Sequence, residues 1–228
     1  MRALIVDDER LARVELTRLL AAHPEVEIAG EARNGEEALE QIRKLTPDIV
    51  FLDIQMPGMT GFEVLERLDD VPPVIFTTAY DQYAIQAFEV SALDYLLKPV
   101  APARLAAALA KVRPRPERGR IEQVFVRDGD RCWIVRMAEI FLLESEGNYT
   151  RVYFGAERPL IRRSLNALEE QLDPAMFFRA GRKEMINLKW IDRVDLAVSG
   201  GLVVTLRGGR AVEMSRRQSA RLREILAL

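Results

Sequence analysis

The stretch from Asp48 to Gly58 constrains the fold of this chain more than any other. Four apolar residues at positions 49–52, Ile-Val-Phe-Leu, lead directly into a single carboxylate, Asp53, and the turn residues Met56-Pro57-Gly58 follow. A short apolar run that is bounded by turn residues indicates a strand buried on both faces. Ligands of parallel α/β sheets bind at the carboxyl ends of the strands. We therefore interpret Asp53 as a phosphate acceptor at the tip of a buried strand.

The length and the charge distribution of the chain indicate two domains with different partners. The 228 residues, 49% of them hydrophobic, suffice for two domains with cores of their own. Residues 1–113 contain 12 basic and 19 acidic residues, whereas residues 114–228 contain 21 basic and 16 acidic residues. An acidic half that is joined to a basic half suggests that the basic half binds a polyanion.

The composition also argues against several classes of protein. No apolar run approaches the roughly 20 residues that span a membrane. The N-terminus becomes acidic at Asp7, which is too early for a signal peptide. Cys132 is the single cysteine, so neither a disulfide framework nor a cysteine metal cluster is expected. We expect a cytoplasmic protein that does not bind a membrane.

Residues 1–113 alternate between short apolar runs and segments with helical periodicity. Five segments with apolar residues at helical spacing follow the expected strands, from residues 9–22 to the alanine-rich residues 102–112. Strands that alternate with helices predict a parallel sheet that is covered on both faces. The expected strands comprise residues 3–6, 26–32, 49–53, 74–78 and 93–97.

Polar side chains stand at the ends of four of these strands. Asp7 and Asp8 follow the first strand, Asp53 ends the third, Thr78 the fourth, and Lys98 follows the fifth. If the first and third strands are neighbours, each pair of carboxylates at roughly 5 Å repels by about 3 kcal/mol at an effective dielectric of about 20. Mg²⁺, which prefers oxygen ligands, would relieve this repulsion. Lys98 and Thr78 would hold phosphoryl oxygens, so the set predicts a phosphoryl-transfer site.

These residues have two other interpretations. Considered alone, Asp7 or Asp8 could cap a helix and Asp53 could belong to a turn, but their joint order at strand ends argues against this. A phosphohydrolase that forms an aspartyl-phosphate is the second alternative. Haloacid-dehalogenase enzymes place an acid two residues after the nucleophile, where this chain has Gln55. Gln55 cannot donate a titratable proton, which favours a stored phosphate over rapid turnover.

Residues 1–113 resemble the receiver domain of two-component response regulators. The matching residues are Asp7-Asp8, Asp53 with Met56-Pro57-Gly58, Thr78-Ala79 and Lys98-Pro99. The resemblance implies a flavodoxin-like, doubly wound α/β fold with five parallel strands. It also implies that a sensor histidine kinase phosphorylates Asp53, and that the chain is no enzyme beyond this transfer to its own aspartate.

The resemblance assigns further roles. Asp8, Asp53 and the Gln55 carbonyl are expected to hold Mg²⁺, with Asp7 supporting it through water. Thr78 and Tyr95 form the expected switch pair, and the Lys98–Pro99 peptide is expected to be cis. Phosphorylation is expected to favour a homodimer through the face formed by the fourth helix, the fifth strand and the fifth helix. Candidates for this face are Gln82, Glu89, Arg104 and Lys111.

A change of pattern marks the second half of the chain. Residues 114–120 lie in a charged segment that has two prolines and no apolar residue, which indicates a linker between domains 1–113 and 121–228. Short strands follow, separated by turn residues such as Asp128-Gly129-Asp130 and Ser199-Gly200-Gly201. Residues 121–228 are therefore expected to form a mainly β domain.

Residues 121–228 resemble the LytTR type of DNA-binding domain. The matching segments are 140–150, 163–165, 177–188 and 214–217. The resemblance implies a transcription regulator that inserts loops into successive major grooves of double-stranded DNA. The residues expected to contact DNA are Asn148, Arg182, Lys183 and Arg217.

The segment from Gly181 to Glu184 departs from the family, which often has His, a polar residue, Ser and an aromatic residue there. Chemically, Arg182 can donate to guanine edges, Lys183 suits a phosphate, and Glu184 could accept from cytosine or pair with Arg182. Phe177 and Phe178 are assigned to the core, and Asn187 to a local turn. A receiver whose β domain binds protein or RNA stays open as an alternative.

Overall fold

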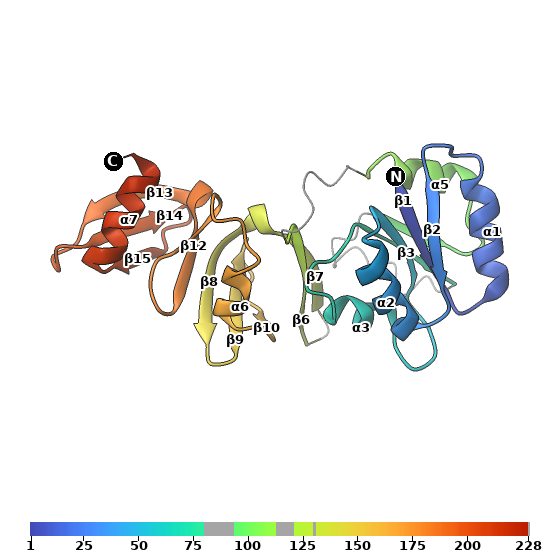
Figure 1. The fold of residues 1–228 in the computed structure, drawn as a ribbon, viewed down its shortest axis with the longest axis horizontal. Coiled ribbons are helices and arrows are strands. Elements are labelled where there is room, and N and C mark those ends of the chain that lie inside the picture. The colour runs from blue at the N-terminus through green and yellow to red at the C-terminus, as the bar shows by residue number, and fades with distance from the viewer. Residues whose placement is uncertain (80–93, 113–120, 130, 228) are drawn as a thin grey trace. The chain divides into compact units, whose positions relative to one another are not determined.

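The computed structural model describes residues 1–79, 94–112, 121–129 and 131–227. By its internal contacts the chain forms two compact units (Figure 1). The first unit comprises residues 1–118 with 123–134, and the second comprises residues 119–122 with 135–228. The expected linker at 114–120 lies outside the described residues, so the predicted domain boundaries stay a prediction.

The first unit is built on a five-stranded parallel sheet with the order β2-β1-β3-β4-β5. Because β1 and β3 are neighbours, their carboxyl ends meet at the point where the strand order reverses. This topology confirms the predicted doubly wound, flavodoxin-like fold. Its strands are β1 (Arg2–Val6), β2 (Glu27–Ala32), β3 (Ile49–Asp53), β4 (Val74–Thr78) and β5 (Asp94–Leu97).

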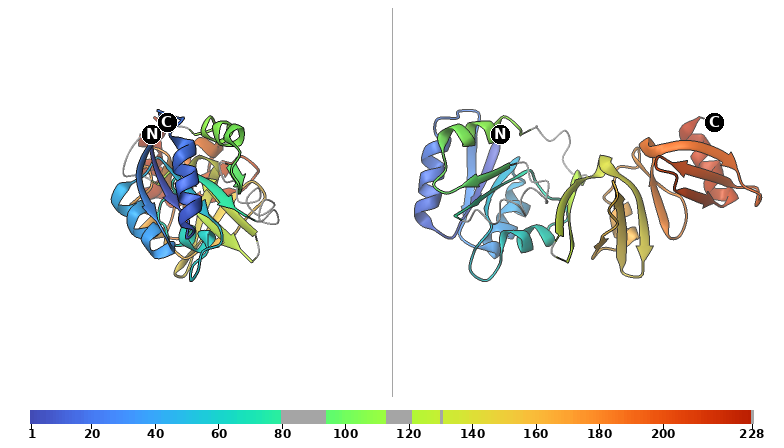
Figure 2. Two further views of the ribbon diagram at one scale, coloured as in Figure 1. Left: turned by 90° about the vertical axis from the view of Figure 1, so that its right-hand side faces the viewer. Right: turned by 180° about the vertical axis from the view of Figure 1, so that it is seen from behind.

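Strand β3 is buried along its whole length, as its apolar sequence predicts. Successive side chains point to opposite faces of a sheet, and β3 accordingly contributes to two separate cores. Val50 and Leu52 belong to one apolar cluster, whereas Ile49 and Phe51 belong to the other. Helices cover both of these faces (Figures 1 and 2).

The four described helices of this unit divide between the two faces. Helices α2 and α3 pack on the cluster of Val50 and Leu52, and helices α1 and α5 pack on the other cluster. Asn34 caps α2, and Thr60 with Glu63 forms a capping box at the start of α3. The expected fourth helix lies outside the described residues. The bounds are α1 (Arg10–Leu20), α2 (Gly35–Leu45), α3 (Gly61–Glu66) and α5 (Pro102–Leu109).

A two-stranded hairpin completes the first unit and packs beside α3. The ring of Phe125 is buried in the same cluster as α2 and α3, and its centroid lies 6.4 Å from that of Phe62. An ion pair of 3.1 Å joins Arg127 to Glu66 at the end of α3. The sequence predicts the hairpin itself but not its packing on α3. Its strands are β6 (Gln123–Asp128) and β7 (Arg131–Arg136).

The second unit is mainly β, as predicted. One sheet has the order β10-β9-β8-β12-β11 and the other has the order β13-β14-β15. The first comprises β8 (Ile140–Glu146), β9 (Tyr149–Phe154), β10 (Leu160–Ile161), β11 (Phe177–Arg179) and β12 (Glu184–Asn187). The remaining elements are η1 (Met137–Glu139), α6 (Leu165–Glu169), η2 (Leu188–Trp190), β13 (Ile191–Leu196), β14 (Leu202–Leu206), β15 (Ala211–Met214) and α7 (Arg216–Leu226).

The core of the second unit confirms three interpretations of single residues. Phe177 and Phe178 are buried, as assigned. Asn187 is fully buried, and its side-chain oxygen accepts a 3.0 Å hydrogen bond from the N–H of Lys189, as expected for a local turn. Its amide also donates to the carbonyl of Ile140 at 2.8 Å, so its role is structural. Strand β12, which lies between β8 and β11, was not expected from the sequence.

Within the described part of the chain, no helix is long and apolar enough to cross a membrane.

Candidate functional site

Three carboxylates converge at the carboxyl ends of β1 and β3. Asp7 and Asp8 follow β1, and Asp53 is the last residue of β3. One carboxylate oxygen of each residue lies within 4.8 Å of those of the other two. Asp7 and Asp53 are buried, and Asp8 is the more exposed of the three. Oxygen ligands with one open side fit Mg²⁺, which keeps several of its waters.

Lys98 places its ammonium group between two of these acids. Its Nζ lies 2.7 Å from Oδ2 of Asp7 and 2.7 Å from Oδ2 of Asp53. Its backbone N–H donates a 2.8 Å hydrogen bond to the carbonyl of Thr78, which fixes the start of the loop after β5. Burial alone would lower the pKa of Lys98, but its hydrogen bonds to the two carboxylates outweigh burial and raise that pKa. The Lys98–Pro99 peptide is cis, as expected.

The environment of Asp53 disfavours a negative charge. Burial is the largest influence and raises the pKa of the carboxyl, and the nearby charge of Asp7 acts in the same direction. The hydrogen bonds from Lys98 and from the backbone N–H of Gln55, at 2.7 and 3.1 Å, offset this only in part. A further positive charge at the open side would therefore stabilise the ionised site.

The other three predicted site residues lie after β3, at the end of β4 and within β5, and they are Gln55, Thr78 and Tyr95. The side chain of Gln55 is exposed, whereas Thr78 is fully buried at the end of β4. The residue before it, Thr77, is the register partner of Asp53, so Thr78 stands at the same rim of the sheet. Tyr95 is half-buried in β5 and packs against the cluster of β3 and α3. The switch role of Thr78 and Tyr95 stays a prediction.

Arg13 on α1 belongs to this site and was missed by the sequence reasoning. Its Nη1 donates to the carbonyl of Asp7 at 2.8 Å and to that of Asp8 at 3.4 Å, while its Nε donates to Glu31 at 2.9 Å. The guanidinium therefore fixes the turn that carries both acids. The available signal was a basic residue at helical spacing from Leu16 on the buried face of α1.

An open pocket of about 310 Å³ adjoins Asp7 and Lys98. Leu11 of α1 lines this pocket and is 73% exposed, and Val14, one turn along the same helix, is 52% exposed. The pocket therefore combines charged groups with an exposed apolar edge on α1.

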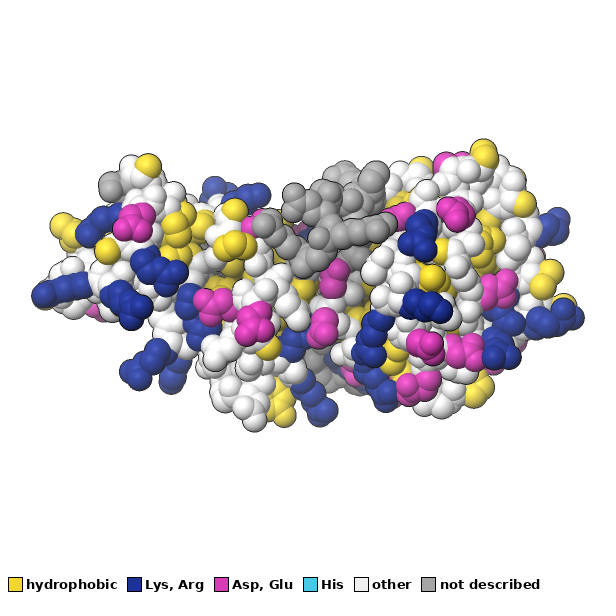
Figure 3. Space-filling model, in the orientation of Figure 1, with side chains coloured by type: hydrophobic (Ala, Val, Ile, Leu, Met, Phe, Trp, Pro, Cys, Tyr) yellow, Lys and Arg dark blue, Asp and Glu magenta, His cyan; other side chains and the backbone are white. Residues whose placement is uncertain are grey.

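The residues that are expected to contact DNA are exposed in the second unit. Asn148 lies in the turn between β8 and β9, and Arg182 and Lys183 lie in the loop between β11 and β12. The backbone N–H of Ser145 donates to the carbonyl of Lys183 at 2.7 Å, which links this loop to the end of β8. Arg217 is exposed in the first turn of α7. Figure 3 shows Lys and Arg side chains projecting from this unit.

Glu184 differs from these exposed residues because it belongs to the sheet. It begins β12 and lies opposite Glu144 of β8. Burial, and then the charge of Glu144, raise the pKa of the Glu184 carboxyl. The ammonium of Lys183 and the guanidinium of Arg210 act against this rise. A half-buried acid with an acid as its cross-strand neighbour is poorly placed to read a base.

Comparison with known proteins identifies both halves of the chain. Residues 3–110 match the family model of the response regulator receiver domain, and residues 130–227 match that of the LytTr DNA-binding domain. A response regulatory protein of Vibrio cholerae is 36% identical over 99% of this chain and 98% of its own length. The chain belongs to the LytTR response regulators. The LytTR response regulator described here is thus a transcription regulator with a receiver and a DNA-binding domain, as both resemblances predicted.

Two further relatives and two solved structures resemble the LytTR response regulator. The transcriptional regulatory protein BtsR of Escherichia coli is 35% identical over the whole of both chains, and the sensory transduction protein LytT of Enterococcus faecalis is 32% identical over the same extent. The response regulatory domain of mrkE from Klebsiella pneumoniae is 35% identical, with a TM-score of 0.45 over 49% of this chain and 94% of that one. A LytTr DNA-binding domain from Bacillus cereus is 20% identical, with a TM-score of 0.44 over 47% and 98%.

Proposed function

We propose that this LytTR response regulator stores a phosphoryl group on Asp53, and that a sensor histidine kinase donates it. The observation that carries the proposal is the position of Lys98, which holds Asp53 and Asp7 together at 2.7 Å from each. In the transfer, an oxygen of Asp53 forms a bond to phosphorus while the bond from phosphorus to the kinase histidine breaks. Lys98 and the hydroxyl of Thr78 then donate hydrogen bonds to the phosphoryl oxygens.

The acid cluster suits Mg²⁺ as the cofactor of this transfer. The carboxylates of Asp8 and Asp53 and the carbonyl of Gln55 would hold the ion, and Asp7 would support it through water. A bound Mg²⁺ supplies positive charge to the phosphoryl oxygens. Arg13 holds the carbonyls of Asp7 and Asp8, so both carboxylates stay oriented toward the open side. Gln55 provides no acid for hydrolysis, which favours a stored phosphate.

The exposed apolar edge of the pocket suits the kinase as a partner. Leu11 and Val14 present apolar surface on α1, which begins directly after the acids of the site. A kinase domain that covers this edge would bring its histidine to the open side of Asp53. Exposed apolar residues beside a charged pocket are typical of such an interface.

We further propose that phosphorylation promotes a homodimer. Thr78 would move toward the phosphoryl group and Tyr95 would follow into the space that it leaves. On the predicted face, Arg104 and Lys111 pair with Asp94 at 3.0 and 2.9 Å within one chain. Burial opposes the charge of Asp94, but these two cations outweigh burial and lower the pKa of its carboxyl. The other two candidates, Gln82 and Glu89, lie outside the described residues.

Arg104 and Lys111 keep capacity for a partner chain. Their side chains remain 55% and 51% exposed although both pair with Asp94, and each has further donors. Acidic residues of a second chain could therefore join this network without a conformational change. Light scattering with and without a phosphate donor measures whether the dimer forms, and a mass that stays constant would contradict this step.

For the second unit we propose that Asn148, Arg182, Lys183 and Arg217 contact double-stranded DNA. All four side chains are exposed, and the unit has an excess of basic residues. We retain as a proposal the division into a receiver at 1–113, a linker at 114–120 and a DNA-binding domain at 121–228, although residues 123–134 of that last range pack with the first unit. Two such domains in a dimer would bind two half-sites with raised effective concentration.

Two experiments test these assignments. Asp53→Asn should abolish labelling by acetyl phosphate in the presence of Mg²⁺, whereas the matched change Asp192→Asn, at an exposed acid of β13, should leave labelling intact. Label that persists in Asp53→Asn would place the acceptor elsewhere. Affinity for duplex DNA should fall with salt with a log–log slope of several units, since several cations bind phosphates. An affinity that does not change with salt would favour a β domain that binds protein. Tighter binding to RNA than to duplex DNA would favour a β domain that binds RNA.

A further inference from the structure

Arg179 ends β11, directly before the loop that carries the basic residues Arg182 and Lys183. Unlike theirs, its charged group already makes hydrogen bonds within the protein. Nε donates to the carbonyl of Gly181 at 2.7 Å, and Nη2 donates to the carbonyl of Arg182 at 2.6 Å. Nη1 pairs with a carboxylate oxygen of Glu169 at 3.0 Å. The side chain of Arg179 is only 15% exposed. Arg182 and Lys183, in contrast, are exposed.

The two carbonyls that Arg179 binds belong to the backbone of the loop that carries Arg182 and Lys183. The guanidinium donates to the carbonyls of two successive residues, Gly181 and Arg182, and so fixes two successive peptide groups. Gly181 lies in this loop, and a Cβ at that position would meet no atom within 4 Å, so no side chain packs against it there. Backbone hydrogen bonds also close the loop, from the N–H groups of Ala180 and Gly181 to the carbonyl of Glu184 at 3.0 and 3.1 Å. Arg179 is the side chain that adds to them at Gly181 and Arg182, so it helps to set the direction in which Arg182 leaves the backbone.

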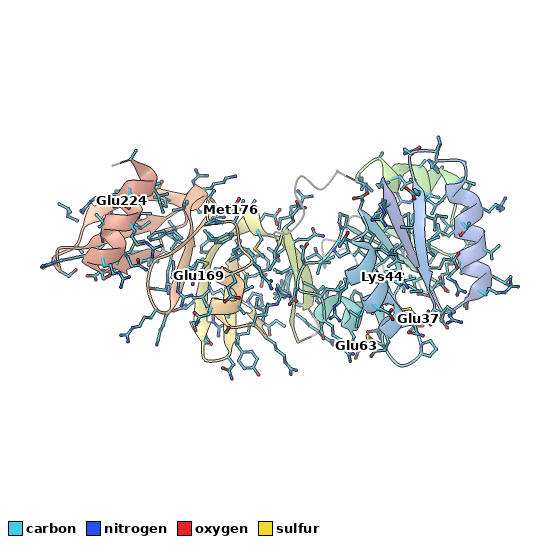
Figure 4. The ribbon with its side chains drawn as sticks, viewed as in Figure 1. Glu37, Lys44, Glu63, Glu169, Met176 and Glu224 are labelled. Atoms are coloured by element: carbon cyan, nitrogen blue, oxygen red, sulfur yellow. The ribbon has the colours of Figure 1, made fainter. Side chains whose placement is uncertain are left out.

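Arg179 is in turn held at two points, its guanidinium and its backbone carbonyl. Glu169 is the last residue of α6 (Figure 4), and its carboxylate fixes Nη1. The backbone carbonyl of Arg179 accepts a 2.8 Å hydrogen bond from the amide of Gln218 in α7. The residue before Gln218 is Arg217, another candidate DNA contact. Arg179 thus connects α6 and α7 to the loop between β11 and β12.

We infer that Arg179 is a positioning residue for DNA recognition, held by Glu169, and that it does not contact DNA itself. This inference rests on the proposed DNA binding by Arg182 and Lys183. It gives Glu169 the role of holding Arg179, which would explain an acidic residue near the proposed DNA contacts.

The charge of Glu169 makes the inference testable, because two explanations predict opposite changes in the DNA affinity of Glu169→Gln. If only long-range charge matters, Glu169→Gln removes a negative charge near DNA and strengthens binding. If Glu169 holds Arg179 in place, the same change weakens binding, because the loop loses its fixed orientation. The carboxylate of Glu169 is 47% exposed, so the substitution leaves the core intact.

The matched control is Glu170→Gln, the same change of charge one residue along the chain. Glu170 is also exposed, and none of its described contacts involves Arg179. Both variants are compared with the wild type as full-length proteins. The probe is a duplex that the wild-type protein selects from a random pool, and fluorescence anisotropy measures its Kd at several salt concentrations.

We expect Glu169→Gln to weaken binding about fivefold, as loss of one charge-assisted hydrogen bond would. Its salt slope should equal that of the wild type, since no phosphate contact is lost. Glu170→Gln should bind as tightly as the wild type or more tightly. Arg179→Lys, which keeps the charge but cannot bind both carbonyls and Glu169, should weaken binding with the same unchanged slope.

Equal or tighter binding by Glu169→Gln relative to Glu170→Gln would overturn the positioning role. So would wild-type affinity of Arg179→Lys, or a salt slope lowered by about one in Glu169→Gln. These outcomes differ from failure of the proposed function, in which the wild-type protein itself would select no duplex.

Discussion

Lys98 holds two buried carboxylates together, and its replacement by Met tests the charge balance of the receiver. Lys98→Met keeps much of the side-chain volume and removes the ammonium that lies 2.7 Å from both Asp7 and Asp53. The two acids, whose side chains are nearly buried, then face each other without a counter-charge. We expect the variant to fold with reduced stability.

The structure sets the size of the loss. One oxygen of Asp7 and one of Asp53 lie within 4.8 Å of each other. At an effective dielectric of about 20, two unit charges at this distance repel by about 3 kcal/mol. Their side chains are only 5% and 7% exposed, so salt screens the repulsion weakly. Lys98→Met should therefore lower the free energy of unfolding of the first unit by about 3 kcal/mol at neutral pH.

The loss should depend on pH with a definite sign. Burial already raises the pKa of Asp53 in the folded state, and removal of Lys98 takes away the group that lowers it. With a folded-state pKa above the unfolded value, the folded protein binds more protons than the unfolded one as the pH falls. The stability of Lys98→Met relative to wild type should thus recover as the pH falls through the raised pKa of Asp53 and decline as the pH rises through it.

Urea unfolding in a Trp190→Phe background measures this, because Trp133 then reports on the first unit. Asp53→Asn serves as the control background. With Asp53 neutral, Lys98→Met should cost far less, since Asp7 alone remains. Equal losses in both backgrounds, or a loss that grows on acidification, would refute the electrostatic explanation. Millimolar MgCl₂ should stabilise Lys98→Met.

Two further substitutions test contacts of the first unit. Arg13→Met leaves the carbonyls of Asp7 and Asp8 without their donor, so it should lower the free energy of unfolding by about 2 kcal/mol and weaken Mg²⁺ binding in calorimetry; unchanged Mg²⁺ affinity would contradict the positioning of the acids. Phe125→Ala removes a buried ring beside α3 and should cost about 3 kcal/mol in urea unfolding. A much smaller cost would mean that the hairpin does not share the receiver core.

The sequence predicts those features that depend on local pattern and on strand order. The apolar residues before Asp53 are buried on both faces, as their run implies, and the ends of β1 and β3 meet because parallel strands share one edge. The convergence of Asp7, Asp8 and Asp53 follows from these two facts alone. Tertiary detail beyond the strand ends was not required for this part of the site.

Other features depend on contacts that a local pattern does not contain. Helix α1 buries the face that carries Arg13, Leu16 and Leu20. Arg13 can be buried there because the carbonyl of Asp7 and the carboxylate of Glu31 accept hydrogen bonds from its guanidinium. Leu11 lies outside this face and is exposed. Strand β12 is only four residues long and follows the polar segment Gly181–Lys183, so its pairing with β8 and β11 decides its conformation.

The burial of β3 limits how the receiver can respond at Asp53. The strand is fully buried and is hydrogen-bonded to β1 on one side and to β4 on the other, so the carboxylate cannot move away from its neighbours with the backbone. Its charge can be balanced only by a proton, a cation or Lys98. Any response to a phosphoryl group must therefore pass through side chains at the rim. Thr78 at the end of β4 and the half-buried Tyr95 are placed to carry it, which is why we expect the switch there.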